Sequence, residues 1–278
     1  MDSRRRNVFH MHLISDSTGE TLNMVARAAA AYYADYHAVE HIYALVRTPQ
    51  QMERVFGEIE RHPGIVLFTL ADGALRSQLE DGCRKFAIPY ISILDPVISS
   101  LESFLNAKSR PHIGGQHALN AEYFRRIDAL NYSLLHDDGQ HPDDLESADV
   151  VLVGVSRSSK TPTSIYLAIR GYKTANIPLV PGIPLAPQIL GLERPLVVGL
   201  TASADRISQI RQHRLLGLSP GTDTSYADRQ AIAAELVNAR AICSARGWPM
   251  IDVTRRSIEE TAAAIINLLH ERRDAMAQ

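Results

Sequence analysis

The stretch Val150-Val-Leu-Val-Gly-Val-Ser-Arg-Ser-Ser-Lys-Thr161 joins an apolar run to a serine-rich turn and then to a helical pattern. Gly154, Lys160 and Thr161 stand at the spacing of the phosphate-binding loop (P-loop) G-x-x-x-x-G-K-[ST]. In such a loop, backbone N–H groups surround the phosphates, the lysine neutralises their charge, and the threonine hydroxyl binds Mg²⁺. The sequence therefore predicts a nucleotide site between a buried strand and a helix.

One position of the loop departs from this pattern. Ser159 stands where the second glycine is expected, and a serine at this position can still present its N–H if its φ is negative. The alternative is a serine-rich turn with a solvated arginine and lysine, but the strand before it and the helix after it favour the phosphate site. The residues predicted to contact the nucleotide are Gly154, Val155, Ser156, Arg157, Ser158, Ser159, Lys160 and Thr161, and Thr161 is also the predicted Mg²⁺ ligand.

Short apolar runs alternate with helical patterns on both sides of this loop, which is typical of parallel sheets covered by helices. We expect an α/β protein with two domains, an N-terminal parallel-sheet domain over residues 1–120 and a P-loop kinase-like domain over residues 121–278. Residues 99–115 break the alternation, 109–115 are expected to form a loop, and 132–135 are expected to be extended. The expected strands are 8–15, 40–46, 64–70, 90–94, 148–155, 176–180, 196–200 and 250–253, and the expected helices are 20–34, 50–61, 73–86, 121–130, 161–170, 205–216, 227–245 and 257–272.

The composition excludes several classes of function. The chain has 278 residues, a net charge of −2 and 22% charged residues, so neither nucleic acid nor an anionic membrane is an expected partner. No apolar run approaches the roughly 18 residues that a membrane-spanning helix needs. The two cysteines, Cys83 and Cys243, are too few and too far apart for a disulfide scaffold or a cysteine zinc site. We expect a cytoplasmic protein.

Two other segments could take part in binding or catalysis. Ser15-Asp-Ser-Thr-Gly-Glu20 follows the first expected strand, and it either binds an anion at a helix start or forms a capping box between Ser17 and Glu20. We favour the capping box. His136-Asp-Asp-Gly139 places an imidazole and two carboxylates beside a turn, where they could act as a general base or hold Mg²⁺, although Asp-Gly is also a common turn pair.

A basic helix is the last candidate. It carries Arg206, Arg211, His213 and Arg214, which could join Arg157 in binding phosphoryl oxygens. Their spacing does not place all of them on one helix face, so we expect at least one to lie on a solvated surface.

Three of these segments, in the same order, resemble a known family over nearly the whole chain. They are Ile14–Gly19, His136–Gly139 and Gly154–Ser164. The chain is similar to the regulatory proteins of pyruvate, phosphate dikinase and phosphoenolpyruvate synthase. Many members carry glycine where this chain has Ser159. The segments Glu40–Arg47 and Tyr172–Val180 are closer to the dikinase branch.

The resemblance implies a bifunctional enzyme whose protein substrate is the dikinase. One activity uses ADP to phosphorylate a threonine of the dikinase and inactivate it. The other removes that phosphate with inorganic phosphate and releases pyrophosphate. In this chemistry we assign Lys160 and the loop amides to the nucleotide phosphates, Arg157 to the transferred group, and Asp137 or Asp138 to the role of base. P-loop regulators of this size are often homodimers.

Three alternatives remain open from the sequence. The same chemistry could act on phosphoenolpyruvate synthase. A small-molecule P-loop kinase would prefer ATP and would turn over without a protein partner. A non-catalytic nucleotide-sensing regulator would bind nucleotide through Lys160 and leave no covalent phosphate on its partner.

Overall fold

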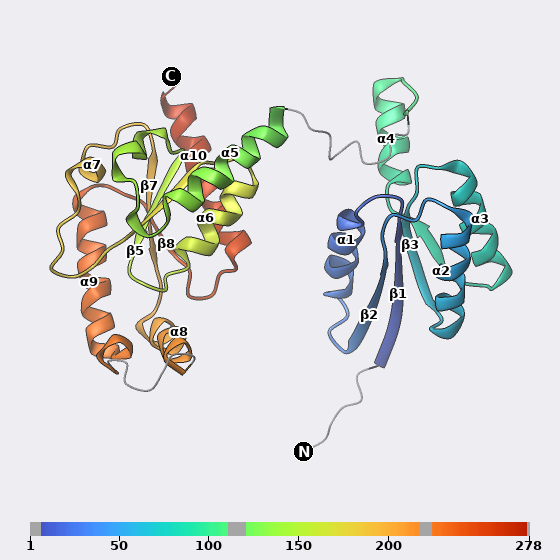
Figure 1. Cartoon of the computed structure of the whole chain (residues 1–278), viewed down its shortest axis with the longest axis horizontal. Coiled ribbons are helices and arrows are strands. Elements are labelled where there is room, and N and C mark those ends of the chain that lie inside the picture. The colour runs from blue at the N-terminus through green and yellow to red at the C-terminus, as the bar shows by residue number, and fades with distance from the viewer. Residues whose placement is uncertain (1–6, 111–120, 217–223, 277–278) are drawn as a thin grey trace, which may run out of the picture. The chain divides into compact units, whose positions relative to one another are not determined.

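The computed structural model describes residues 7–110, 121–216 and 224–276 (Figure 1). The chain is an α/β protein that divides into two compact units, Met1–Ala118 and Leu119–Gln278. Each unit contains one four-stranded parallel sheet with interleaved helices. Within the described residues, no helix has both the length and the apolar character that crossing a membrane requires.

The sheet of the first unit has the strand order β2-β1-β3-β4, and all its pairings are parallel. Its strands are β1 (Asn7–Ser15), β2 (Tyr36–Tyr43), β3 (Gly64–Thr69) and β4 (Tyr90–Ser92), and its helices are α1 (Glu20–Ala30), α2 (Pro49–Arg61), α3 (Gly73–Lys85) and α4 (Asp95–Leu105). Helix α1 covers one face of the sheet, and α2 and α3 cover the other (Figure 1). The two faces therefore bury separate apolar clusters, as expected when crossover helices lie on both sides of a parallel sheet.

Two expectations for the first unit are wrong. The capping box between Ser17 and Glu20 does not form, because Gly19 in the left-handed conformation (φ 77°) begins α1 without any side-chain cap. Residues 95–105 form α4, although no helix was expected there. The apolar residues of α4 recur at helical spacing, but none of them is buried; they are Val97, Ile98, Leu101, Phe104 and Leu105. The remainder of the expected loop, 111–115, lies outside the described residues.

The sheet of the second unit has the equivalent strand order, β6-β5-β7-β8, and is also parallel. Its strands are β5 (Val150–Gly154), β6 (Thr174–Pro178), β7 (Leu196–Thr201) and β8 (Met250–Asp252). Its helices are α5 (Ala121–Leu135), α6 (Lys160–Ile169), α7 (Pro187–Leu190), α8 (Ala204–Leu216), α9 (Arg229–Ala245) and α10 (Ile258–Met276), with short 3₁₀ turns at Asp137–Gly139, Pro142–Ser147 and Thr224–Ala227. Helices α5, α6 and α10 pack on one side of the sheet, and α9 packs on the other (Figure 1).

Tyr132 to Leu135 were expected to be extended but form the last turn of α5. Tyr132 is buried, its hydroxyl donates a hydrogen bond to the carbonyl of Asp144, and its own carbonyl accepts one from the N–H of His136. The helix is thus continued to the start of the acidic turn by tertiary contacts.

The strand order positions the predicted P-loop. Strand β5 lies between β6 and β7, so the chain leaves β5 toward β6 and later returns to the opposite side. This reversal is a topological switch point, and ligands of open α/β sheets bind in the crevice at the carboxyl ends of such strands. The P-loop follows β5 at this point.

Candidate functional site

The P-loop begins at a glycine that no other residue can replace without displacing backbone. Strand β5 is buried along its whole length, and Gly154 ends it. A Cβ atom at this position would lie 2.5 Å from the carbonyl oxygen of Leu200 on β7 and 2.8 Å from Oγ of Ser158. Because both contacts are far inside van der Waals distance, glycine is required here.

The turn after Gly154 contains two residues with left-handed backbone. Arg157 has φ 72° and Ser159 has φ 63°. The condition of a negative φ at Ser159 is therefore not met, and this serine adopts the conformation that glycine would adopt without strain. Ser158 is fully buried between them, and its hydroxyl donates a hydrogen bond to the carbonyl of Val155 at 2.9 Å.

Lys160 is held in the interior of the loop. Its side chain is only 6% exposed, and Nζ donates a hydrogen bond to the carbonyl of Val155 at 3.0 Å. Burial lowers the pKa of Lys160 to about 8, an effect that the carboxylates of Asp138 and Asp137 oppose and that Arg157 reinforces. An amine that is buried with so little solvent is stabilised in its charged form by an incoming anion.

Asp137 is connected to Thr161 through a small polar network. The hydroxyl of Thr161 donates to Oδ1 of Asp137 at 3.0 Å, and Nδ2 of Asn176 also donates to that oxygen. Asn176 is fully buried on β6, and its Oδ1 accepts the N–H of Asp138 at 3.1 Å. One asparagine thus fixes the acidic turn against the start of α6.

The three polar residues of the acidic turn have different environments. His136 is 4% exposed, stacks on Tyr132 with ring centroids 3.8 Å apart, and shares a hydrogen bond between Nδ1 and the carbonyl of Tyr132. It is therefore a packed residue of the turn. Asp137 is partly buried and bonded as described, whereas Asp138 is exposed and has left-handed backbone (φ 51°).

Thr161 and Asp137 together present the oxygen atoms that Mg²⁺ prefers. A hydroxyl and a carboxylate 3.0 Å apart beside the phosphate loop fit this ion, which usually takes one or two protein ligands plus phosphate oxygens and water. Within the described residues, no group of three or more histidine, cysteine or acidic side chains is arranged to hold a metal ion by itself.

The basic helix α8 separates into a buried and an exposed part. Arg211 is 1% exposed and forms two hydrogen bonds to the carboxylate of Glu235 on α9, at 2.9 and 2.7 Å. It also donates to the carbonyls of Ser156 and Tyr226, and the hydroxyls of these two residues are 2.8 Å apart. Arg211 therefore supports the P-loop from behind, so the expectation that it binds phosphoryl oxygens is wrong.

The expectation of a solvated face is confirmed for two other residues of this helix. His213 and Arg214 are exposed in the last turn of α8. Arg206 is also exposed and lines a pocket together with Arg157.

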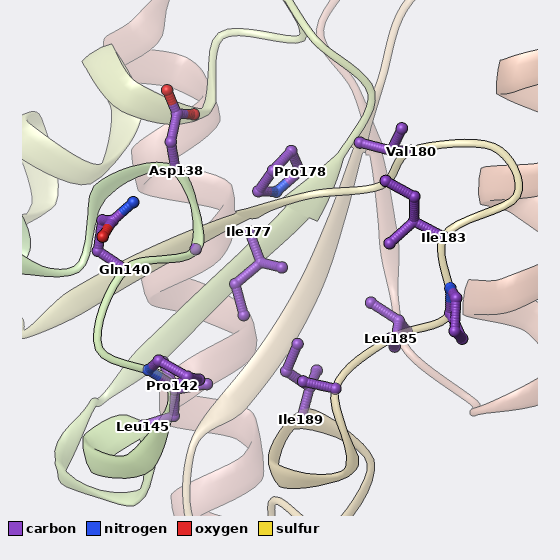
Figure 2. A pocket seen from close by; sticks show the side chains of 13 residues that line it. Asp138, Gln140, Pro142, Leu145, Ile177, Pro178, Val180, Ile183, Leu185 and Ile189 are labelled. Atoms are coloured by element: carbon purple, nitrogen blue, oxygen red, sulfur yellow. The ribbon is translucent and has the colours of Figure 1, made fainter.

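Two pockets flank the P-loop region. One, of about 290 Å³, lies at the end of β6 and is mostly apolar, with Asp138 and Gln140 at its edge (Figure 2). Figure 2 shows Ile177, Leu185 and Ile189 around its interior. The other, of about 370 Å³, is lined by residues of the loop itself, of the β7–α8 connection and of the start of α10. The loop itself is thus accessible beside β7.

The loop after β1 is held by buried polar side chains. Oγ of Ser15 accepts hydrogen bonds from the N–H of Ser17 and the hydroxyl of Thr69, and the carboxylate of Asp16 accepts the N–H of Ala71. Both side chains are buried, so they hold the loop and the end of β3 together.

Sequence reasoning missed Asn176, Glu235 and Tyr226. Asn176 could have been found from the sequence, because it is a polar residue within a largely apolar strand and buried polar groups need hydrogen-bond partners. Glu235 and Tyr226 could not have been found in this way, because nothing in the sequence relates them to Arg211.

Comparison with known proteins identifies the family. The model of the kinase/pyrophosphorylase family matches residues 11–266. A protein of Rhodopseudomonas palustris (strain HaA2), named pyruvate, phosphate dikinase regulatory protein, is 58% identical over 265 residues, which cover 95% of each chain. Proteins of the same name from Bradyrhizobium diazoefficiens and Rhizobium meliloti (strain 1021) are 58% and 56% identical, over 96% and 95% of this chain and 96% and 97% of their own. This chain therefore belongs to the kinase/pyrophosphorylase family.

Proposed function

We propose that this protein reversibly phosphorylates a threonine of pyruvate, phosphate dikinase. In the forward direction, the threonine hydroxyl attacks the β-phosphorus of ADP, the bond to the α-phosphate oxygen breaks, and the products are phosphothreonine and AMP. In the reverse direction, an oxygen of inorganic phosphate attacks the phosphothreonine phosphorus, which restores the threonine and forms pyrophosphate. Both steps are phosphoryl transfers, so positioning and charge stabilisation supply the catalysis.

The observation that carries the proposal is the placement of Lys160, Thr161 and Asp137 around one loop. The buried amine of Lys160 and the loop amides would hold the phosphates of the donor. Thr161 and Asp137 would hold Mg²⁺, which supplies positive charge to the phosphate oxygens. A serine-rich turn that binds no ligand would explain neither the burial of Lys160 nor the hydrogen-bonded carboxylate of Asp137 beside it.

The acidic turn suggests which carboxylate acts as the base. Asp137 already accepts hydrogen bonds from Thr161 and Asn176. Asp138 is exposed and lies at the edge of the apolar pocket beside β6. Its carboxylate is close enough to Lys160 to oppose the lowering of the lysine's pKa by burial. We therefore assign Asp138 to accept the proton of the target threonine and Asp137 to the metal side. Arg157 would stabilise charge on the transferred phosphoryl group.

The names of the relatives support the dikinase as the target. The test is a mass measurement on purified dikinase incubated with phosphoenolpyruvate, this protein and either ADP or ATP. We expect one added phosphate on a threonine with ADP, none with Lys160→Ala, and wild-type behaviour with Lys173→Ala. Lys173 is a suitable matched control because it is a lysine of the same unit that takes no part in the loop. Its ammonium pairs with Asp128 on α5, at 2.8 Å.

The remaining outcomes separate the alternatives. Adding inorganic phosphate should remove the phosphate from the threonine and release one pyrophosphate for each phosphate removed. Phosphorylation of phosphoenolpyruvate synthase in place of the dikinase would transfer the proposal to that target. Nucleotide binding without phosphate on either protein would contradict the catalytic proposal and leave a nucleotide-sensing regulator.

A further inference from the structure

The pocket at the end of β6 has mostly apolar walls. Its volume is about 290 Å³, and of the described residues that line it only Asp138 carries a charge. Part of the wall consists of buried side chains, among them Leu145, Ile177 and Ile189. A pocket of this size and chemistry fits a large apolar side chain, since a cavity of about 150 Å³ lined by similar residues already holds a benzene ring.

Another part of the wall is an exposed apolar turn. The N–H of Ile183 donates a hydrogen bond to the carbonyl of Val180 at 3.1 Å, and Gly182 between them has φ 76°, which is typical of a type II turn with Pro181 before the glycine. The side chains of Val180 and Ile183 are 43% and 65% exposed, although both line the pocket (Figure 2). Exposed apolar side chains gathered around a cavity indicate a binding surface.

The pocket begins where the proposed proton acceptor stands. Asp138 lies at its edge, and the next residue, Gly139, also lines it. Figure 2 shows the side chain of Asp138 pointing away from Ile177 and Ile189. A threonine hydroxyl that reaches this carboxylate therefore lies on one side of the rim, with the cavity on the other. Because successive side chains of an extended chain point in opposite directions, a residue next to that threonine would point into the pocket.

We propose that this pocket binds the apolar side chain of a residue directly next to the target threonine, and that Val180 and Ile183 determine specificity for that residue. Contact with a side chain that does not react would position the threonine at Asp138. A nucleotide is less suited to the pocket, because none of the described residues that line it is basic. The inference rests on the proposed function and adds to it a requirement on the sequence of the protein substrate.

The test removes apolar surface at an exposed position, where the fold should tolerate the change. In Ile183→Ser the side chain becomes short and polar, and Ile183→Leu is the conservative variant. Val237→Ser on α9 is the matched control, because Val237 is also 65% exposed and does not line the pocket. Rates of ADP-dependent phosphorylation at a series of dikinase concentrations would give kcat and KM for the protein substrate, and calorimetry would give the affinity for ADP.

We expect Ile183→Ser to raise KM for the dikinase at least about fivefold, because the loss of one methylene contact in an apolar pocket already costs roughly tenfold. Its kcat and its affinity for ADP should change less than about twofold, since the lost contact binds substrate and transition state alike. Ile183→Leu should restore most of the loss, and Val237→Ser should match wild type.

The dikinase supplies the second half of the test. Serine in place of the apolar neighbour of the target threonine should raise KM for wild type by a similar factor. The same dikinase variant should change KM of Ile183→Ser by less than about twofold, because the contact is already lost. A substitution that only disturbed the turn would give independent, additive effects in this comparison.

Several results would overturn the inference. An unchanged KM in Ile183→Ser, additive effects of the two substitutions, or a target threonine without an apolar residue on either side would mean that the pocket does not bind the target segment, while the proposed activity would stand. A loss of ADP affinity in Ile183→Ser would assign the pocket to the nucleotide. If wild type adds no phosphate to the dikinase under the same conditions, the proposed function itself fails, and this inference fails with it.

Discussion

Replacing Ser159 by glycine should stabilise the second unit, although the position lies in the functional loop. Ser159 has φ 63° and forms the N-terminal boundary of α6. Left-handed backbone costs a residue with a Cβ atom about 1–2 kcal/mol, and glycine escapes this cost. Glycine also gains about 0.5–1 kcal/mol of additional chain entropy in the unfolded state. The difference predicts a net stabilisation of about 0.5–1 kcal/mol for Ser159→Gly.

Ser159→Ala is the matched comparison. Within the described residues, the hydroxyl of Ser159 forms no hydrogen bond, and alanine keeps both the Cβ atom and the strain. We therefore expect Ser159→Ala to lie within about 0.5 kcal/mol of wild type.

Urea unfolding followed by circular dichroism would measure both variants. With a slope of about 2 kcal/mol per molar urea, Ser159→Gly should raise the midpoint of the second unit by about 0.3–0.5 M. If Ser159→Gly proves no more stable than Ser159→Ala, backbone strain at this position is not the cause, and the reasoning from φ is refuted.

Three further predictions concern charge and polar contacts. Since the pKa of Lys160 is lowered to about 8, the affinity for ADP should fall as pH rises through that value. Calorimetry from about pH 7 to 9.5 would measure this fall, and the affinity of Lys160→Arg should stay constant over the same range because arginine remains charged. Asn176→Ala removes the donor to Asp137 and the acceptor for the N–H of Asp138, and it should cost about 1–3 kcal/mol of unfolding free energy; an unchanged urea midpoint would contradict the polar network. Burial and neighbouring histidines lower the pKa values of His12 and His41, so the native first unit binds fewer protons than the unfolded chain, and its stability should fall as pH decreases below about 6.5. Urea midpoints between pH 8 and 5 should show this loss, and His41→Gln should reduce it.

Much of the fold of the second unit could be predicted because β5 and β7 are buried on both faces. The run from Val150 to Gly154 is entirely buried, and it reads as a continuous apolar segment bounded by a turn. Helix α4 was missed although its apolar residues recur at helical spacing, and the folded unit leaves these residues exposed. The end of α5 was missed because the Asp-Gly turn marks a boundary in sequence, while the contacts of Tyr132 that extend the helix are tertiary.

The candidate site also contains residues that the sequence predicts and residues that only the folded chain brings together. Gly154, Lys160 and Thr161 belong to one local motif, and local sequence is sufficient to suggest their roles. Asn176 lies 39 residues from its partner Asp137, and Arg211 lies 55 residues from the carbonyl of Ser156 that it supports. No local rule connects residues at these separations, so the supporting contacts became visible only in the folded chain.

These supporting contacts explain how the P-loop can exist with a serine in place of glycine. Arg157 and Ser159 each carry the cost of left-handed backbone, about 1–2 kcal/mol per residue. Four hydrogen bonds hold the same turn, namely those from Ser158 and Lys160 to Val155, from Arg211 to Ser156, and between Ser156 and Tyr226. At about 0.5–1.5 kcal/mol each, they are sufficient to offset the strain.

Strain that persists because its surroundings overdetermine it is typical of functional sites. In this loop it fixes the directions of the backbone N–H groups before any ligand arrives. Under the proposed function, an incoming phosphate would meet a preformed loop and the buried Lys160, so less ordering would be needed on binding. Relief of the strain in Ser159→Gly should consequently stabilise the fold without improving ADP affinity, because the energy stored in the free protein is retained in the complex.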